Sequence, residues 1–292
     1  MKKLLALLVI AAPLLVHAQD AEITYDHEVV APGIYRLIGA DGQFAGGGVG
    51  LLTGDEYVVL IDDGLYPTGK ALLAKVEELA GRPADFIINT HAHGDHTGAN
   101  QLFANNGAII VAHDNLRKRM QADENQNTGP GALPVITFSN EVTFHVNGQE
   151  AFVFHVDSAH TDGDAAILFR EANVIAPGDI VFRGLFPFID LDSGGSVEGY
   201  KRAMRRLIDM ADNDTRFISG HGPIATRAGL ETDLAMLTDA EARVKALLDK
   251  GMTADDIVAT NPLAAYHDQY NWGFISTERM TRTLIRSLTT DD

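Results

Sequence analysis

Residues 91–96 read His91-Ala92-His93-Gly94-Asp95-His96 and closely follow a short apolar stretch, Phe86-Ile87-Ile88. Four side chains that can bind metal therefore lie within six residues, just after a segment that the pattern predicts to be a buried strand. Imidazole and carboxylate groups are good zinc ligands. A turn at this point can direct residues 91 and 93 to one ion and residues 95 and 96 to a neighbouring one. The alternative is a polar surface loop in which three histidines occur by chance.

The composition restricts what kind of metal site the chain can build. None of its 292 residues is a cysteine, so any metal must be held by His, Asp or Glu. The hydrophobic fraction of 46% is that of an ordinary globular protein. The sequence contains no tandem repeat and no linker-like stretch. We therefore expect a single domain over residues 19–292, with a helical tail from about residue 251.

The N-terminus has the pattern of a secretory signal peptide. Met1-Lys2-Lys3 precedes an apolar run over residues 4–16, and Val16-His17-Ala18 is typical of a cleavage site. The alternative is a retained membrane anchor, but the run is shorter than the roughly 20 residues that span a bilayer. The sequence predicts a signal peptide over residues 1–18 and a periplasmic or secreted protein.

The net charge of the chain restricts which classes of molecule it can bind. Removing residues 1–18 takes away two lysines and no acidic residue, which changes the formal net charge from −17 to −19. So acidic a surface repels nucleic acid and anionic lipid headgroups. We expect a small-molecule substrate, no nucleic acid and no stable membrane insertion once the signal peptide is cleaved. The oligomeric state cannot be inferred from the sequence.

Strand-like and helix-like patterns alternate along the rest of the chain. Apolar β-branched runs predict strands, and apolar residues at helical spacing predict helices. The expected strands are a hairpin over residues 49–61, then 86–88, 108–111, a hairpin of 141–146 and 151–156, 165–169, 173–176 and 216–219; the expected helices are 68–80, 198–210 and about 230–250. This mixture predicts mixed sheet structure with helices packed outside it.

The motif of residues 91–96, His-x-His-x-Asp-His, resembles the hallmark of the metallo-β-lactamase superfamily. His160, Asp179 and His221 extend the resemblance, because each follows strand-like residues and they occur in the family's order. The resemblance covers about residues 23–250. It implies an α+β four-layer αββα sandwich, in which two mixed β-sheets pack face to face between layers of helices.

The resemblance also implies two Zn²⁺ ions per chain and assigns a ligand set to each. The first ion would be held by His91, His93 and His160, the second by Asp95, His96 and His221, and Asp179 would bridge both. A water shared by two ions about 3.5 to 4 Å apart loses a proton near neutral pH and becomes a nucleophile. Asp95 is the candidate catalytic residue, because it would both bind metal and orient this hydroxide.

Other residues are candidates for supporting roles. Asp62 or Asp63 can orient a ligating imidazole, or the pair can belong to a plain turn. Four aromatic residues are candidates either for an apolar substrate pocket or for ordinary core: Tyr66, Phe182, Phe186 and Phe188.

Three further expectations concern the remaining glycines, aromatics and histidines. The glycine-rich loop over residues 42–48 is a candidate lid. Trp272 and Phe274 are expected to pack a terminal helix onto the domain. The histidines outside the four segments, His113, His145, His155 and His267, are expected at the surface or at helix starts.

Differences between this sequence and particular members of the superfamily narrow the range of reactions that it can be expected to catalyse. His93 stands where the di-iron oxygen reductases of this superfamily have glutamate, which favours hydrolysis. The lack of cysteine excludes the β-lactamases with a cysteine ligand, and a bridging Asp179 is more typical of hydroxyacylglutathione hydrolases and lactonases. Few basic residues follow Asp179 or Gly251 to bind the carboxylates of glutathione.

The sequence therefore predicts an exported dinuclear zinc hydrolase that uses a metal-bridging hydroxide to open a cyclic amide or ester, such as a β-lactam or a lactone. One alternative is a thioesterase of the hydroxyacylglutathione hydrolase type. An alternative of another class is a non-catalytic metal-binding protein that keeps the fold.

Overall fold

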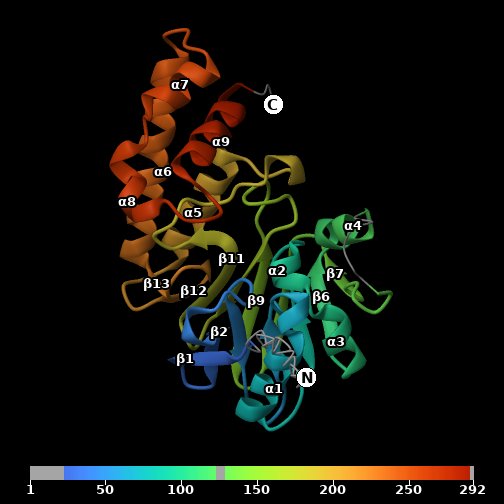
Figure 1. The fold of residues 1–292 in the computed structure, drawn as a ribbon. Helices are drawn as coiled ribbons and strands as arrows, with labels where there is room; N and C mark the ends of the chain where they lie inside the picture. The colour runs from blue at the N-terminus through green and yellow to red at the C-terminus, as the bar shows by residue number, and fades with distance from the viewer. Residues whose placement is uncertain (1–22, 123–128, 290–292) are drawn as a thin grey trace, which may run out of the picture.

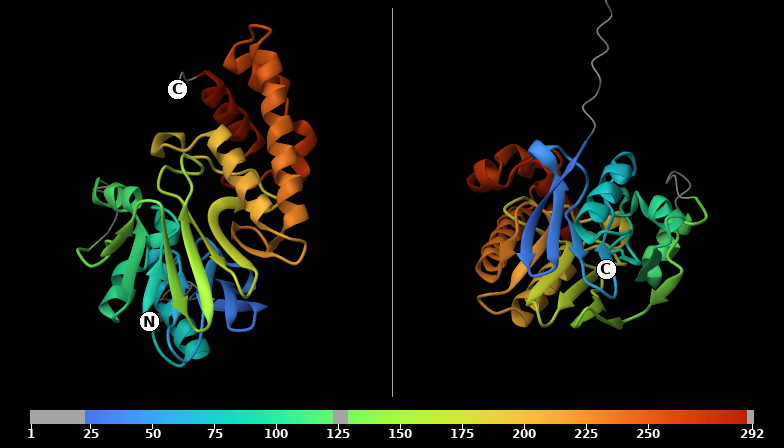
Figure 2. Two further views of the ribbon diagram at one scale, coloured as in Figure 1. Left: turned by 180° about the vertical axis from the view of Figure 1, so that it is seen from behind. Right: turned by 90° about the horizontal axis from the view of Figure 1, so that it is seen from below.

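Two β-sheets face each other, and helices cover both outer faces (Figures 1 and 2). The computed structural model describes residues 23–122 and 129–289, so the expected signal peptide, residues 1–18, lies outside the described residues. The predicted arrangement of two mixed sheets flanked by helices is confirmed.

The N-terminal sheet has the strand order β1-β2-β3-β4-β5-β6-β7. Its strands are β1 (Tyr25–Ala31), β2 (Ile34–Gly39), β3 (Val49–Leu52), β4 (Val59–Ile61), β5 (Phe86–Ile88), β6 (Ile109–His113) and β7 (Ile136–Phe138). Neighbours from β1 to β4 are antiparallel, and those from β4 to β7 are parallel. Helices make the crossovers that parallel strands need: α1 (Gly69–Ala80), α2 (Gly94–Thr97), α3 (Asn100–Asn105) and α4 (Asp114–Ala122).

The second sheet has the strand order β13-β12-β11-β10-β9-β8. Its strands are β8 (Glu141–Val146), β9 (Gln149–His155), β10 (Ala165–Phe169), β11 (Val174–Phe182), β12 (Arg216–His221) and β13 (Ala225–Thr226). Only β11 and β12 pair in parallel among these described strands, and α5 (Val197–Met210) connects them. The Ser196 hydroxyl accepts a hydrogen bond from the Gly199 amide and caps α5.

Among the described residues, four helices follow the second sheet, and four short 3-10 helices lie in the connections. The helices are α6 (Arg227–Leu248), α7 (Ala254–Thr260), α8 (His267–Tyr270) and α9 (Thr277–Thr289). The 3-10 helices are η1 (Ala40–Gly42), η2 (Tyr66–Thr68), η3 (Leu191–Ser193) and η4 (Ala264–Tyr266). None of the described helices combines the length and the apolarity that a membrane span requires.

Alternating side chains of the strands build the layers. In β5 the side chain of Ile88 joins the apolar cluster between the sheets, with Val153 and Ile167 of the second sheet. The preceding Ile87 points the other way and packs in the cluster that includes Leu72 of α1. Because successive side chains of a strand face opposite sides, an apolar run of this kind is buried on both faces.

The C-terminal helices belong to the core on the outer face of the second sheet. Leu237 of α6, Ile257 of α7 and Leu284 of α9 lie in one buried cluster with Phe217 of β12. Figure 1 shows these helices in orange and red beside β11 and β12. The tail beyond residue 251 therefore packs on the same core as the second sheet.

One expected strand is longer than its sequence pattern indicates. The strand expected at residues 173–176 runs on as β11 to Phe182, so Asp179 lies within a strand rather than after one. Pro177 and Gly178 usually end strands, but here the pairing of β11 with β12 shifts register around Gly178. This irregularity lets the strand continue.

We predict that Leu284→Ala lowers the free energy of unfolding by about 2 to 5 kcal/mol, because it opens a cavity in the core. Leu284 is fully buried. Leu288→Ala, in the partly buried last turn of the same helix, is the matched control and should cost less. Urea unfolding of both variants measures the difference, and equal small losses would show that α9 does not share the core.

Candidate metal centre

Four segments that are far apart in the sequence bring seven candidate ligands together. Residues 91–96 follow β5, His160 lies in the connection between β9 and β10, Asp179 lies in β11 and His221 ends β12. Their metal-binding atoms form two groups, and within each group these atoms lie no more than 4.8 Å apart. The groups are those that the resemblance implies: His91, His93, His160 and Asp179 in one, and Asp95, His96 and His221 in the other.

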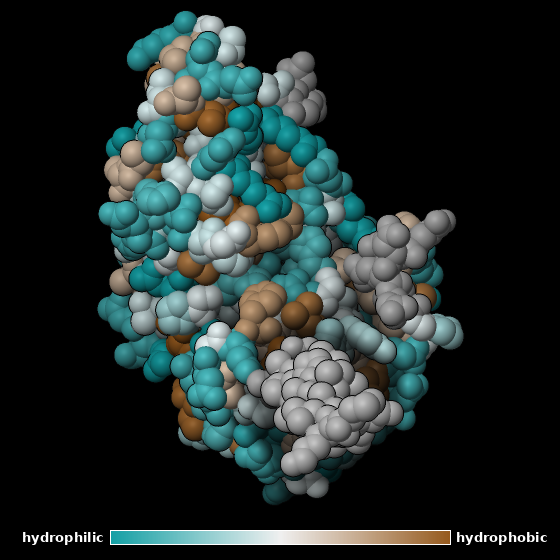
Figure 3. Space-filling view, in the orientation of Figure 1, coloured by the Kyte–Doolittle hydropathy of each residue, from teal (hydrophilic) through white to brown (hydrophobic). Residues whose placement is uncertain are grey.

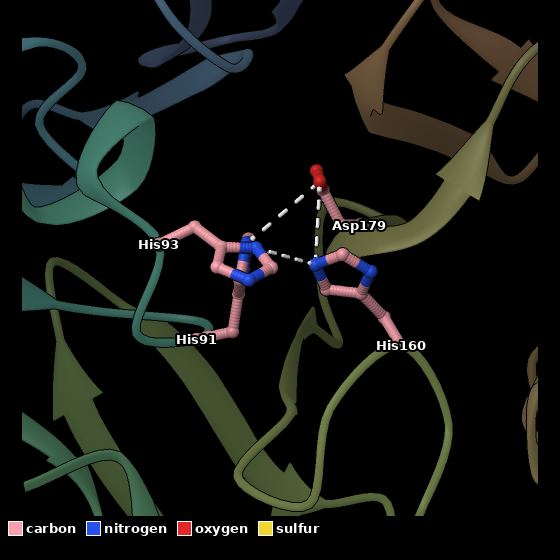
Figure 4. Close-up of side chains that lie close together, drawn as sticks. All are labelled: His91, His93, His160 and Asp179. Carbon is pink, nitrogen blue, oxygen red and sulfur yellow. Dashed lines mark hydrogen bonds and ion pairs between the residues drawn. The ribbon is translucent and has the colours of Figure 1, made fainter. Parts of the chain in front are cut away.

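The first group lies in the interior below the pocket. Figure 4 shows His91 and His93 entering from one loop, with His160 of the β9–β10 connection and Asp179 of β11 facing them. The Nδ1 atom of His93 lies 2.9 Å from Nε2 of His160. The Asp179 Oδ2 atom is 3.6 Å from Nε2 of His160 and 3.8 Å from Nε2 of His91. One ion can therefore reach a single atom of each residue.

Asp179 of the first group also lies close to the second group. The Asp179 Oδ1 atom is 3.1 Å from Nε2 of His96, and the Asp179 Oδ2 atom is 3.4 Å from Nε2 of His221. The Oδ2 atom of Asp95 lies 3.7 Å from Nε2 of His96 and 3.4 Å from Nε2 of His221. The Asp179 carboxylate thus lies between the two groups, where a bridging ligand would be.

Hydrogen bonds on the outer side of His160 and of His93 determine which ring nitrogen faces the centre. The His160 Nδ1–H donates to the carbonyl of Phe188 (2.8 Å), because a carbonyl can only accept, and this directs Nε2 towards the centre and His93. On the same side of the centre, Nε2 of His93 lies 3.0 Å from the carboxylate of Asp190, which directs Nδ1 inward. Partners of this type orient metal ligands.

Asp62 orients one histidine of each group. Its carboxylate is buried and accepts from the backbone N–H of Thr90 (2.7 Å), the hydroxyl of Thr90 (2.8 Å) and Nδ1 of His96 (2.8 Å). Because the Thr90 hydroxyl donates its one proton to Asp62, it accepts from Nδ1 of His91 (3.0 Å). The carboxylate of Asp63 instead accepts from the Ala99 amide (2.9 Å), so of the two it is Asp62 that contacts the imidazoles.

Burial keeps two histidines of the first group neutral. It lowers the pKa of His160 to about 4, and together with the neighbouring His96 and His160 it holds the pKa of His91 well below its usual value. Neutral imidazole is the form that binds metal. Both rings are therefore ready to accept a cation near neutral pH.

In the second group, neighbouring carboxylates raise the histidine pKa values instead of leaving them lowered by burial. Burial lowers the pKa of His221, but Asp179 and Asp95 outweigh burial and raise the pKa to about 9. Burial likewise opposes protonation of His96, whose pKa Asp179, Asp95 and Asp62 nevertheless raise. In the absence of metal these two histidines carry the positive charge that balances the carboxylates.

Three buried atoms at the centre have no hydrogen-bond partner: Nε2 of His91, and Nε2 of His96 and Oδ1 of Asp179, which face each other at 3.1 Å as an ion pair. Each polar group that stays buried and unpaired costs about 1 to 3 kcal/mol. All three point into the two groups and belong to residue types that bind zinc. The residues present therefore fit a metal centre.

The glycine-rich loop packs against this centre. Its Gly47 amide donates to the carbonyl of Asp95 (3.0 Å), and its Gly48 amide donates to that of Gly220 (2.7 Å). A Cβ atom on Gly47 would lie 2.1 Å from the His96 ring, so only glycine fits there. Close packing explains the glycine at position 47 without a lid.

A pocket of about 710 Å³ is lined in part by four of the candidate ligands, His93, Asp95, Asp179 and His221. Tyr66, Phe182 and Phe188 also line it. The expectation that Phe186 lines it is wrong, because the Phe186 side chain is fully buried against Tyr270. The Phe186 amide donates to the carbonyl of Tyr270 (2.8 Å), which fixes that part of the chain in the core.

Four residues lie at this site that the sequence did not predict to be there. Phe44, Trp272 and Phe274 line the pocket, although the last two were expected only to pack a terminal helix. The fourth is Asp190, which contacts His93 from 97 residues away. Of these, only Phe44 has a sequence signal, as a large apolar residue inside a glycine-rich loop.

The chain belongs to the Metallo-beta-lactamase superfamily, because residues 46–221, more than half of the chain, match the sequence profile of that family. A probable metallo-hydrolase of Bacillus subtilis is 26% identical over 180 residues, which cover 59% of this chain and 83% of that protein. A probable metallo-hydrolase of Methanocaldococcus jannaschii is 26% identical over 182 residues, which cover 58% of this chain and 84% of that protein. The predicted family is confirmed.

Solved structures show the same fold. A metallo-beta-lactamase from Pontibacter korlensis superimposes with a TM-score of 0.64 at 18% identity, over 74% of this chain and all of that one. A sec-alkyl sulfatase variant superimposes with a TM-score of 0.70 at 14% identity, over 91% of this chain and 50% of that one. The chain is thus a member of a superfamily of metallo-hydrolases, and its cluster of His and Asp residues could hold metal.

We predict that removing metal with a chelator lowers the melting temperature. Zinc at a thousandfold excess over its Kd stabilises the folded state by about 4 kcal/mol, which corresponds to roughly 8 to 16 °C. Differential scanning fluorimetry before and after chelation, and after zinc is added back, measures the shift. A melting temperature that responds to neither treatment would contradict a metal centre.

We also predict that zinc binding releases protons at pH 7. Without metal, His221 is protonated at that pH because its pKa is raised to about 9, and a metal ion must displace this proton. Apparent zinc affinity should therefore rise between pH 6 and pH 8. Calorimetric titration of the chelated protein in two buffers of different ionisation enthalpy counts the protons, and identical heats in both would refute the expectation.

Proposed function

We propose that the protein is an exported dinuclear zinc hydrolase that opens a cyclic amide or ester, such as a β-lactam or a lactone. The observation that carries this proposal is the position of Asp179 between two groups of ligands that otherwise share no residue. The donor set of imidazoles and carboxylates without thiolate suits zinc. Relatives named as probable metallo-hydrolases support hydrolysis as the reaction.

Bound metal ions and the side chain of Asp95 would have separate roles in hydrolysis. Bound zinc ions would supply Lewis acidity and would lower the pKa of water. Asp95 is the group best placed to orient the attacking water and to accept its proton, because of the two carboxylates that line the pocket its side chain is the more exposed, at 23% against 3% for Asp179. Burial opposes ionisation of Asp95, but His96 and His221 outweigh it and lower its pKa. The carboxylate is therefore ionised at neutral pH.

Export is the second part of the proposal. It rests on the charged start, apolar run and Ala18 cleavage site of residues 1–18, and it gives a periplasmic or secreted protein. Small molecules that reach that compartment are then the substrates. A glutathione thioester is a poorer candidate, because its two carboxylates would enter a pocket with no lysine or arginine among its described lining residues.

We predict that His96→Ala reduces hydrolysis by more than the ~10- to 100-fold that losing an outer partner of a metal ligand costs. Zinc content should fall from about two ions per chain towards one, because His96 belongs to the second group only. The test measures zinc by elemental analysis and kcat/KM on a panel of β-lactams, lactones, acyl thioesters and phosphodiesters.

His145→Ala is the matched control, because His145 is exposed and lies outside both groups. It should leave zinc content and kcat/KM unchanged. Thioesters as the best substrates would favour the thioesterase alternative. Bound zinc without any hydrolysis on the panel would favour a non-catalytic metal-binding protein.

A further inference from the structure

The walls of the pocket are aromatic, whereas its floor is polar. Six aromatic rings surround the space above the metal-binding residues: Phe44, Tyr66, Phe182, Phe188, Trp272 and Phe274. Phe182 is buried and stacks on His221, with ring centroids 4.9 Å apart. Phe44, Tyr66 and Phe274 are 59%, 65% and 48% exposed, so the mouth is apolar as well. Figure 3 shows apolar side chains gathered near the middle of this face, below the C-terminal helices.

The size of the pocket indicates a bulky occupant. Its volume of about 710 Å³ is several times the ~150 Å³ of an apolar cavity that holds benzene. It also lies within the range of roughly 300 to 1,000 Å³ that is usual for small-molecule sites. A small ring opened at the floor would leave most of this space empty, so the substrate needs a large second group.

The charges indicate that this second group is neutral. Asp95 and Asp179 lie at the floor, where metal ions would balance them, and the described lining residues include no lysine or arginine. Arg279 is not among the lining residues: its guanidinium lies over the Phe274 ring at 4.2 Å and over the Phe188 ring at 5.2 Å, and it donates to the Phe274 carbonyl (2.9 Å). An anionic group on the substrate would therefore find no cation facing it along the walls.

The C-terminal segment holds its part of the wall in place. The Trp272 indole N–H donates to the carbonyl of Phe186 (2.9 Å), and its ring lies 5.8 Å from that of His221. Phe274 packs edge to face on Phe188, with centroids 5.2 Å apart. Asn271 stabilises the turn, because its side-chain oxygen accepts from the Thr277 amide (3.0 Å). The aromatic wall is thus preformed, which reduces the entropy lost when a ligand binds.

We infer that the aromatic wall formed by Phe44, Tyr66, Trp272 and Phe274 binds a bulky, uncharged apolar group of the substrate, either a long acyl chain or a fused aryl group. The floor then places the scissile amide or ester beside Asp95. The inference rests on the proposed function only for the reaction at the floor. Binding of the apolar group needs no turnover and can be measured separately.

Trp272 is the only tryptophan of the chain, so its fluorescence reports ligand binding in the pocket directly. The probes are non-hydrolysable: N-alkylacetamides of four to ten carbons, naphthalene-2-carboxamide, and N-(2-naphthoyl)glycine as its anionic counterpart. Burying one methylene lowers Kd up to about fourfold. We expect Kd to fall two- to fourfold per methylene in the alkyl arm, or the naphthyl amide to bind at least tenfold more tightly than the shortest acetamide. Either result supports the inference, and together they show whether the pocket prefers an acyl chain or a fused aryl group.

Phe274→Ala should weaken binding of the favoured probe about tenfold. Tyr57→Ala is the matched control, because Tyr57 is a 40% exposed aromatic residue outside the pocket, and it should leave Kd unchanged. A Kd that depends neither on chain length nor on Phe274 would overturn the inference. So would tighter binding of the anionic probe if Arg279→Gln abolished that advantage, because the wall would then recognise charge.

The same proteins separate this inference from the proposed function. If the probes bind as expected but no member of the substrate panel is hydrolysed, the proposed function fails and the apolar subsite stands. If hydrolysis depends on His96 but the probes bind equally to wild type and Phe274→Ala, the hydrolase stands and the subsite fails.

Discussion

One buried carboxylate, that of Asp62, orients both halves of the candidate metal centre. It accepts the hydrogen bond of His96 directly and reaches His91 through the hydroxyl of Thr90. Asp62 directly follows β4 and has a left-handed backbone, with φ of 61°. Its carboxylate also accepts from the Thr90 amide, which ties the end of β4 to the loop after β5. The two ligand groups thus depend on the pairing of two neighbouring parallel strands.

This dependence explains why the sequence can predict which side chains come together at this centre. Residues 91–96 lie close together in the chain, and their spacing alone restricts where their side chains can point. Each distant ligand segment ends in or follows an apolar run, and strands of facing sheets bring such ends to one edge. The family resemblance supplied the pairing of His160, Asp179 and His221 with this loop, which spacing could not. Asp179 was expected in a loop after a strand, because Pro177-Gly178 suggests the end of a strand. In the structure these two residues mark an irregularity inside β11, and Asp179 lies within that strand.

The pocket could not be predicted to the same depth, because its walls depend on long-range packing. Phe186 and Phe188 are two residues apart and chemically identical, yet one lies in the core and the other faces the pocket. What separates them is the backbone contact of Phe186 with Tyr270, which is 84 residues away along the chain. Asp190 likewise acquires its role only when the connection after β11 folds back onto His93. No local sequence pattern predicts the contact of Phe186 with Tyr270 or that of Asp190 with His93.

Both halves of the chain contribute to one site. The N-terminal half supplies four of the seven candidate ligands, those of residues 91–96, and the carboxylates among the seven need cations or protons to balance them. The C-terminal half supplies four of the six aromatic residues that line the pocket, all except Phe44 and Tyr66, and the six together reduce the access of water. Electrostatic interactions are stronger where water is excluded, so an apolar wall strengthens the attraction between the carboxylates at the floor and any bound cation. The same rings that favour a neutral, apolar group thereby also favour the metal chemistry beneath it.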